Sequence, residues 1–147
     1  MKRTQQGFSL IELLIVLAIT AGLLSIVAPR LNNVLEGMKL KNLAREVMAS
    51  LNMTRSQAIS KGEDGVWLLD IENRYFQYGP KKKKVSYTED IGVTLTTASK
   101  EQLSATVANI RFFPDGSATG GEVVLAQGER NYSIQVDWLT GRIQFYD

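Results

Sequence analysis

The spacing of hydrophobic residues changes twice along the chain, and each change predicts a different element. From Leu10 to Ala28, nineteen residues carry a single charge, at Glu12. Beyond Pro29, the apolar residues recur at the spacing of one α-helical face: Leu40, Leu43, Ala44, Val47, Met48 and Leu51. After Gly62, apolar and polar residues alternate with period two, which is typical of β-strands.

One helix from Ser9 to Lys61 accounts for the first two segments. Lys61 and Gly62 form a stop signal, because a basic last turn precedes a residue that tolerates positive φ. Pro29 removes one backbone hydrogen bond, so the sequence predicts a kink there. A proline at a membrane exit and a functional hinge both remain open as explanations of Pro29.

Three structures could accommodate the apolar run. At about 1.5 Å per residue it reaches roughly 28 Å, close to the hydrocarbon thickness of a bilayer. A buried core helix is disfavoured, because nothing later in the chain could cover an apolar surface on all sides. A cleaved signal peptide fits Lys2 and Arg3, but Ala28-Pro29 is a poor cleavage site. A retained membrane anchor fits better.

The remainder of the chain predicts about seven short strands, separated by turns rich in glycine, proline and asparagine. Their ranges are 66–71, 74–78, 91–95, 107–113, 122–126, 132–138 and 142–146. Glu72-Asn73, Pro114-Asp115-Gly116 and Thr140-Gly141 are the clearest turns. We therefore expect an α+β fold, with the amphipathic half of the helix packed on an antiparallel sheet.

Composition excludes several classes of function. The chain has no cysteine and no histidine, so disulfides, thiolate nucleophiles, imidazole bases and the usual zinc ligands are absent. We expect no catalysis, cofactor, metal or small-molecule substrate. The net charge of +2 comes from 17 basic and 15 acidic residues, and removal of Lys2 and Arg3 would leave 15 of each. A neutral chain has no general attraction for nucleic acid.

Glu12 is the unusual residue of the apolar run. A carboxylate within a membrane costs about 2.5–3.5 kcal/mol on the translocon scale, and no Lys or Arg lies within two helical turns after it. Cleavage after Gly7 would create a new cation, the α-amino group of Phe8. The Phe8 amine of a neighbouring copy could then pair with Glu12, which is a hypothesis about assembly.

The segment Gly7-Phe8-Ser9-Leu10-Ile11-Glu12-Leu13 resembles the class III leader junction of type IV pilins and type II secretion pseudopilins. The resemblance implies that a prepilin peptidase cuts between Gly7 and Phe8 and N-methylates Phe8. It also implies that Glu12 guides docking into a fibre, and that the helix loosens near Pro29. The expected divisions are a leader (1–7), a transmembrane or fibre-core helix (8–29), its amphipathic continuation (30–62) and a periplasmic β-rich domain (63–147).

Two later phrases, 112–117 and 137–143, resemble the GspH/FimT group of minor pilin-like proteins. The resemblance implies a pilin-like fold and a minor pseudopilin of type II secretion, anchored in the bacterial inner membrane and partnered by other pseudopilins. The alternative is a minor pilin of a type IV pilus, serving assembly, adhesion or DNA uptake. Only Arg142 is basic after the last turn, which argues against DNA binding.

Other candidate sites have simpler structural explanations. Lys81–Lys84 could contact DNA, lipopolysaccharide or an acidic partner, but without interleaved aromatic residues a solvated loop is favoured. Asp115 could serve a hydrolase or a calcium loop, yet a turn is favoured because no histidine base or further ligands accompany it. Trp67 and Trp138 are expected in the core.

Overall fold

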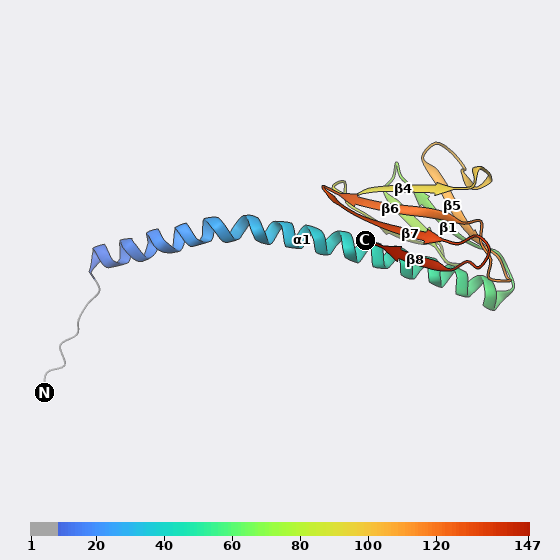
Figure 1. Ribbon diagram of the computed structural model, residues 1–147, viewed down its shortest axis with the longest axis horizontal. Coiled ribbons are helices and arrows are strands. Elements are labelled where there is room, and N and C mark those ends of the chain that lie inside the picture. Colours follow the sequence, from blue (N-terminus) through green and yellow to red (C-terminus); the bar gives the residue numbers. More distant parts are fainter. Residues whose placement is uncertain (1–8) are drawn as a thin grey trace, which may run out of the picture. The chain divides into compact units, whose positions relative to one another are not determined.

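The computed structural model describes the backbone of residues 9–147, and the side chains of residues 9–23 and 37–147 (Figure 1). The described chain begins with one helix, α1 (Leu10–Lys61), and continues with strands and a short 3-10 helix, η1 (Ser99–Glu101). The strands are β1 (Gly65–Asp70), β2 (Tyr75–Tyr78), β3 (Lys83–Ser86), β4 (Gly92–Thr97), β5 (Val107–Phe112), β6 (Gly121–Gln127), β7 (Arg130–Val136) and β8 (Ile143–Tyr146). The chain divides after Glu36 into two units, and the strands belong to the second.

The predicted helix is confirmed to within one residue at its start. It ends as the stop signal indicates: Gly62 has φ +67, and its N–H donates to the carbonyl of Ala58 at 3.0 Å. The backbone is helical through Pro29, whose predicted kink remains a prediction because its side chain lies outside the described residues.

The membrane anchor also remains a prediction. Of the run from Leu10 to Ala28, side chains are described only as far as Leu23. In the described residues, no helix combines the length and the apolar character that crossing a membrane requires.

The strands form two four-stranded antiparallel sheets, a division that the sequence pattern did not predict. Their orders are β3-β2-β1-β5 and β4-β6-β7-β8. Trp67 pairs with Ile110 in the first sheet, and Val123 with Ile134 in the second. All four side chains are fully buried, so the register of each sheet turns its aliphatic and aromatic positions to one face.

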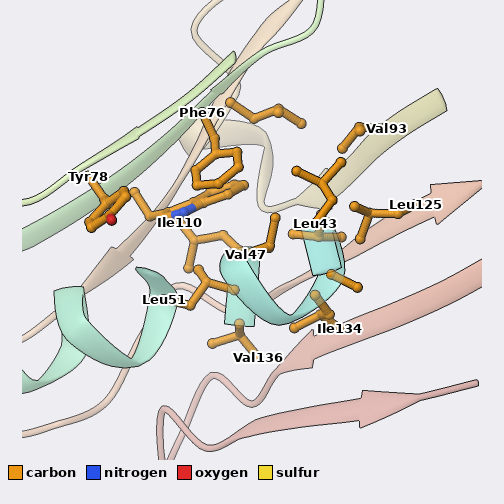
Figure 2. Close-up of a cluster of buried hydrophobic side chains, with 14 of the residues drawn as sticks. Leu43, Val47, Leu51, Phe76, Tyr78, Val93, Ile110, Leu125, Ile134 and Val136 are labelled. Atoms are coloured by element: carbon orange, nitrogen blue, oxygen red, sulfur yellow. The ribbon is translucent and has the colours of Figure 1, made fainter. Parts of the chain in front are cut away.

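The second half of α1 packs against the inner faces of both sheets. Figure 2 shows Leu43, Val47 and Leu51 of the helix surrounded by strand residues. Those strand residues include Phe76, Tyr78 and Ile110 from one sheet and Val93, Leu125, Ile134 and Val136 from the other. The predicted apolar face is confirmed, and only Met48 of its six members is partly exposed.

Between residues 79 and 105 the predicted strand at 91–95 is confirmed as β4, but two other elements were missed. Lys83 and Lys84 were expected in a loop, but they begin strand β3, whose four residues pair with all of β2. Lysine has low strand propensity, so the pattern concealed a strand that hairpin pairing stabilises. The helix η1 was not predicted either, since three residues offer no periodicity.

Candidate assembly site

The first turn of α1 places Glu12 at a defined position. The carbonyl of Ser9 accepts the N–H of Glu12 at 3.1 Å and that of Leu13 at 3.2 Å. Ser9 is therefore the N-cap and Glu12 the third helical residue, the spacing of a capping box. A carboxylate there also interacts favourably with the positive end of the helix dipole. Gly7 and Phe8, the predicted cleavage and methylation sites, lie outside the described residues.

The helical turns after Glu12 expose apolar side chains on every face. From Leu10 to Leu23, each large apolar residue is at least half exposed, with Leu10 the most exposed at 76%. They are Leu10, Ile11, Leu13, Leu14, Ile15, Val16, Leu17, Ile19 and Leu23. Burying surface of this kind is the main favourable term in association, so the segment requires an apolar environment that its own unit does not supply.

One polar side chain of this segment needs no external partner. The hydroxyl of Thr20 donates within the helix, to the carbonyls of Val16 at 2.8 Å and Leu17 at 3.0 Å. Glu12 differs, because no Lys or Arg occurs between residues 9 and 23. It is the one ionic group that an assembled helix bundle around these residues would have to neutralise.

In the folded unit, Arg55 joins the two phrases that suggested a family. Its Nε donates to the carbonyl of Gly116 at 3.1 Å, and its Nη2 to the carbonyl of Thr140 at 3.0 Å. We call Arg55, Gly116 and Thr140 the turn clasp. Gly141, at φ +60, lies so close to the Gly116 carbonyl and the Arg55 side chain that a Cβ there would overlap both. Two turns distant in sequence thus meet on the helix.

A carboxylate closes each of these turns. Asp115 Oδ1 accepts the N–H of Ser117 at 2.9 Å and its hydroxyl at 2.6 Å. Asp137 Oδ1 accepts the N–H of Thr140 at 2.8 Å and its hydroxyl at 2.7 Å. These hydrogen bonds, first those from the hydroxyls, hold the pKa of both carboxyls below the ordinary value. Asp115 therefore acts as a turn residue.

A family model described as "Type II transport protein GspH" matches residues 43–141, about two thirds of the chain, which include both turns and the clasp. The chain belongs to the GspH family. A second model, the prokaryotic N-terminal methylation motif, matches residues 2–28. The resemblance to the GspH/FimT group is thereby confirmed.

Relatives of this GspH-family chain agree with that assignment. Type II secretion system protein H of Xanthomonas campestris pv. campestris is 30% identical over 143 residues, covering 97% of this chain and 84% of the relative. Among solved structures, the minor pseudopilin EpsH of the Vibrio cholerae type 2 secretion system has a TM-score of 0.59 at 12% identity, covering 74% of this chain and 96% of EpsH. The Pseudomonas aeruginosa type IV minor pilin FimU has a TM-score of 0.55 at 15% identity, covering 73% and 92%. At identities this low, the two structures show only that this chain shares their fold, and they confirm the expected α+β, pilin-like arrangement.

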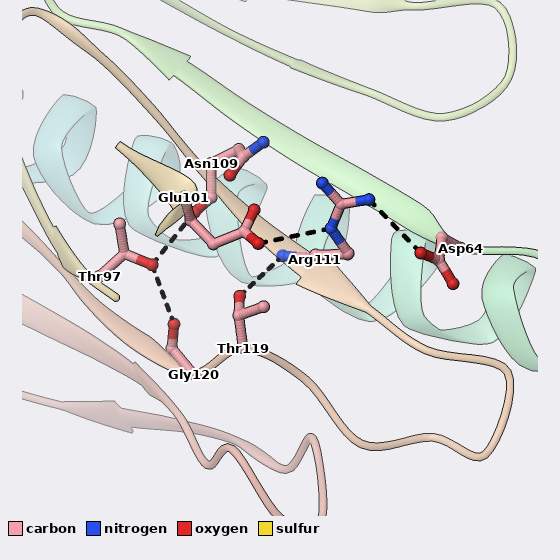
Figure 3. Close-up of polar contacts among 7 residues, drawn as sticks. All are labelled: Asp64, Thr97, Glu101, Asn109, Arg111, Thr119 and Gly120. Atoms are coloured by element: carbon pink, nitrogen blue, oxygen red, sulfur yellow. Dashed lines mark hydrogen bonds and ion pairs between the residues drawn. The ribbon is translucent and has the colours of Figure 1, made fainter. Parts of the chain in front are cut away.

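Sequence reasoning missed a polar cluster in this GspH-family domain, drawn in Figure 3. Arg111 contacts the nearly buried carboxylate of Glu101 and the exposed one of Asp64, each at 3.4 Å. With its amide nitrogen turned toward Glu101, Asn109 also donates to that carboxylate and, at 2.9 Å, to the Glu101 carbonyl. The cluster fixes η1 against β5, and no sequence pattern indicates such pairing.

Thr97 connects the two sheets beside that cluster. Its hydroxyl lies 3.1 Å from the carbonyl of Asn109 and 3.2 Å from that of Gly120, so one donor serves two segments (Figure 3). Within the described residues no three His, Cys, Asp or Glu side chains gather as metal ligands do.

The two tryptophans differ. Trp67 is buried as predicted, stacks on Phe76 at a centroid distance of 5.4 Å, and donates its indole N–H to the hydroxyl of Ser50 at 2.8 Å. The prediction for Trp138 was wrong, because its side chain is 66% exposed. Trp138 follows β7 and precedes the turn to β8, so the alternation that buries Ile134 and Val136 has ended.

Proposed function

We propose that the chain is a minor pseudopilin of a type II secretion system. It would be a structural subunit of the periplasmic pseudopilus that helps to export folded proteins across the outer membrane. The observation that carries the proposal is the 30% identity to type II secretion system protein H over 97% of this chain. The exposed apolar turns of α1 support a role in fibre assembly, because such a surface needs neighbouring helices or lipid.

The proposal includes processing at the N-terminus. A prepilin peptidase would cut between Gly7 and Phe8 and methylate the new Phe8 amine, as the match of residues 2–28 to the N-terminal methylation motif supports. The processed chain would lie in the inner membrane through residues 8–29, with the folded unit in the periplasm. Glu12 would then pair with the Phe8 amine of an adjacent subunit, and Pro29 would loosen the helix.

Processing can be tested by mass. Co-expression with a prepilin peptidase should remove the mass of Met1 to Gly7 and add one methyl group, while Gly7→Leu should block both changes. An unchanged mass in the Gly7-intact chain, under conditions that process a known prepilin, would refute the proposed leader.

A type IV minor pilin is the second candidate, and the similarity to FimU favours it. Its TM-score is only slightly below that of EpsH, so the fold does not separate the two functions. Deleting the gene decides between them. A secretion subunit should lose release of folded exoproteins and keep twitching and transformation, whereas a pilus subunit should show the reverse.

A further inference from the structure

The β2–β3 hairpin carries a concentrated positive charge. We call residues 75–86 the basic hairpin. Lys81 and Lys82 lie in its turn, Lys83 and Lys84 lie on β3, and all four are exposed. Among the described residues, no carboxylate lies within ion-pair distance of any of the four lysines. The domain thus leaves a local excess of charge on one hairpin of an otherwise nearly neutral chain.

Aromatic residues orient two of these ammonium groups. Lys84 Nζ lies 4.3 Å from the ring centroid of Tyr75, and Lys83 Nζ lies 5.7 Å from that of Tyr78. The tyrosines are on β2, across the hairpin, so the lysines have aromatic neighbours in space although none is interleaved with them in the sequence. Such contacts limit the freedom of the side chains and reduce the entropy lost when they bind an anion.

Lys82 occupies a conformation that favours another residue. Its φ is +50, and its N–H donates to the carbonyl of Gly79 at 3.0 Å to close the turn. Glycine and asparagine adopt left-handed backbone readily, whereas a lysine there is strained. Glycine at position 82 would relieve this backbone strain, so the presence of a lysine is a reason to look for a function of its side chain.

β3 is also an open edge. It lies at the end of the sheet order β3-β2-β1-β5. Beyond the strand, the N–H of Tyr87 donates to the carbonyl of Arg74 at 3.0 Å. Because hydrogen-bonded and non-hydrogen-bonded pairs alternate along antiparallel strands, this bond shows which residues of β3 are bonded to β2. Alternation then directs the backbone N–H groups of Lys84 and Ser86 away from β2, where another strand could pair with them.

We propose that the basic hairpin binds an extended acidic segment of a partner protein, which adds to β3 as a fifth strand. Backbone pairing would supply affinity, and the lysines would select carboxylates. A second copy of this edge is disfavoured as the partner, because pairing would bring the exposed lysines of both copies onto neighbouring strands, where like charges repel. Nucleic acid is disfavoured, because Tyr78 is buried and Lys84 covers Tyr75, which leaves no ring for base stacking.

The competing explanation is that the lysines only protect the edge. Charged residues on edge strands commonly prevent aggregation, and that role needs no partner. The two explanations differ in one measurable respect: a protected edge rejects every strand, whereas a receptor edge accepts an acidic one.

Binding can be measured on the full chain in a non-ionic detergent, by fluorescence anisotropy of a labelled peptide Ser-Glu-Val-Glu-Val-Glu-Ser. We expect saturable binding that weakens as salt increases, because exposed charges are screened. A peptide with lysine in place of glutamate should not bind. The acidic peptide N-methylated on alternate amides should bind at least about tenfold more weakly, because it keeps its charge but cannot pair as a strand.

Matched variants separate charge on the hairpin from charge elsewhere. Lys83→Gln with Lys84→Gln should weaken binding about tenfold, whereas Lys41→Gln with Arg45→Gln, on the exposed face of α1, should leave it unchanged. Lys82→Gly should raise the thermal midpoint of the domain and yet weaken binding by about two- to fivefold. Wild-type affinity in the Lys83, Lys84 double variant or in Lys82→Gly would overturn the proposal.

Three further outcomes would also overturn it. Failure of the acidic peptide to bind would leave the lysines as protection of the edge. Equal binding of the N-methylated peptide would identify a general anion surface instead. Displacement of the acidic peptide by inorganic phosphate or duplex DNA, at the same concentration of charge, would do the same. Because the readout is peptide binding, it is independent of secretion and of fibre assembly.

Discussion

The two described parts of α1 both carry leucine and valine, but they use these residues differently. Between Leu10 and Leu23 the apolar side chains are exposed around the whole circumference of the helix. Between Leu40 and Ala58 they lie along one face and are buried under two sheets. The second part completes its apolar contacts within the folded unit, whereas the first part leaves its apolar side chains exposed. The proposed assembly role therefore rests on the first part of the helix, and the stability of the folded unit rests on the second.

Polar groups follow the same division. In the folded unit, Ser50 and Thr54 are buried and each donates to a backbone carbonyl of the preceding turn. Among the described side chains that are not exposed, the hydroxyl of Tyr87 is the buried polar atom without a partner. In the first part, Thr20 is satisfied internally, but Glu12 has no cation within reach in its own segment. Changes in the two parts should therefore have separable consequences.

The largest expected effect follows from Glu12→Gln. Removing one member of a buried ion pair costs about 3–5 kcal/mol, enough to abolish assembly at every subunit contact. Glutamine still supports a capping box, so a role in capping alone would leave assembly intact. We expect Glu12→Gln, Glu12→Ala and Glu12→Leu to remain in the membrane, to keep the thermal midpoint of the folded unit, and to be absent from sheared or cross-linked fibres.

The matched control for Glu12 is Thr20→Val. It removes a second polar group from the same part of the helix, but one that donates within the helix, to the carbonyls of Val16 and Leu17. Thr20→Val should assemble as the wild type does. Normal fibres in Glu12→Gln would leave capping as the role of Glu12 and remove the pairing hypothesis.

A pair of leucine truncations tests the division of stability directly. Leu51 is fully buried, so Leu51→Ala should lower the free energy of unfolding by about 2–5 kcal/mol. Leu14 is 56% exposed, and Leu14→Ala should leave that free energy unchanged. Denaturant unfolding in detergent, followed by the fluorescence of buried Trp67, measures both. Equal destabilisation by the two variants would show that the folded unit depends on the first part of the helix.

A smaller effect is expected from the turn clasp. Arg55→Gln loses hydrogen bonds to the carbonyls of Gly116 and Thr140, and the net value of such bonds is about 1–2 kcal/mol in total. Arg45→Gln is the control, because Arg45 is an exposed arginine of the same helix. The same unfolding experiment should place Arg55→Gln between Arg45→Gln and Leu51→Ala. A result equal to the control would mean that the two turns hold their positions without Arg55.

Elements in which apolar residues recur at a regular spacing could be predicted from the sequence alone. The apolar face from Leu40 to Leu51 was predictable, because six residues at helical spacing share one burial environment. The stop at Gly62 was predictable from local chemistry alone. Strands with alternating aliphatic residues, such as β6 and β7, were found for the same reason, and the two-sheet arrangement was not, because strand order depends on contacts distant in sequence.

Single long-range contacts left no such pattern. Arg55 resembles any exposed helical arginine in the sequence, and only the fold brings Gly116 and Thr140 to it. β3 was missed because lysines seldom indicate strands, although hairpin pairing and the rings of Tyr75 and Tyr78 stabilise them there. Between Leu10 and Leu23, the apolar character and the one carboxylate were predictable from the sequence. The capping position of Glu12 could be assigned only once the structure showed where the helix begins.

Acid should destabilise the folded unit through its turn carboxylates, which is the smallest expected effect. Hydrogen bonds to the hydroxyls of Ser117 and Thr140 hold the pKa of Asp115 and Asp137 below the ordinary value near 3.8. As the pH falls, the unfolded chain therefore binds protons first, so this stabilisation is present above about pH 4 and is lost as the pH falls through the folded pKa values.

Thermal midpoints measured from pH 7 to pH 2.5 should decline in the wild type only in the lower part of that range. In Asp115→Asn with Asp137→Asn, where asparagine can accept the same hydrogen bonds without titrating, the decline should be shallower. Between pH 7 and pH 5 the two proteins should respond to pH alike, and an equal decline below pH 4 would assign the acid sensitivity to other carboxylates, of which Asp70, with its pKa lowered by the backbone N–H of Asn73, is the next to test.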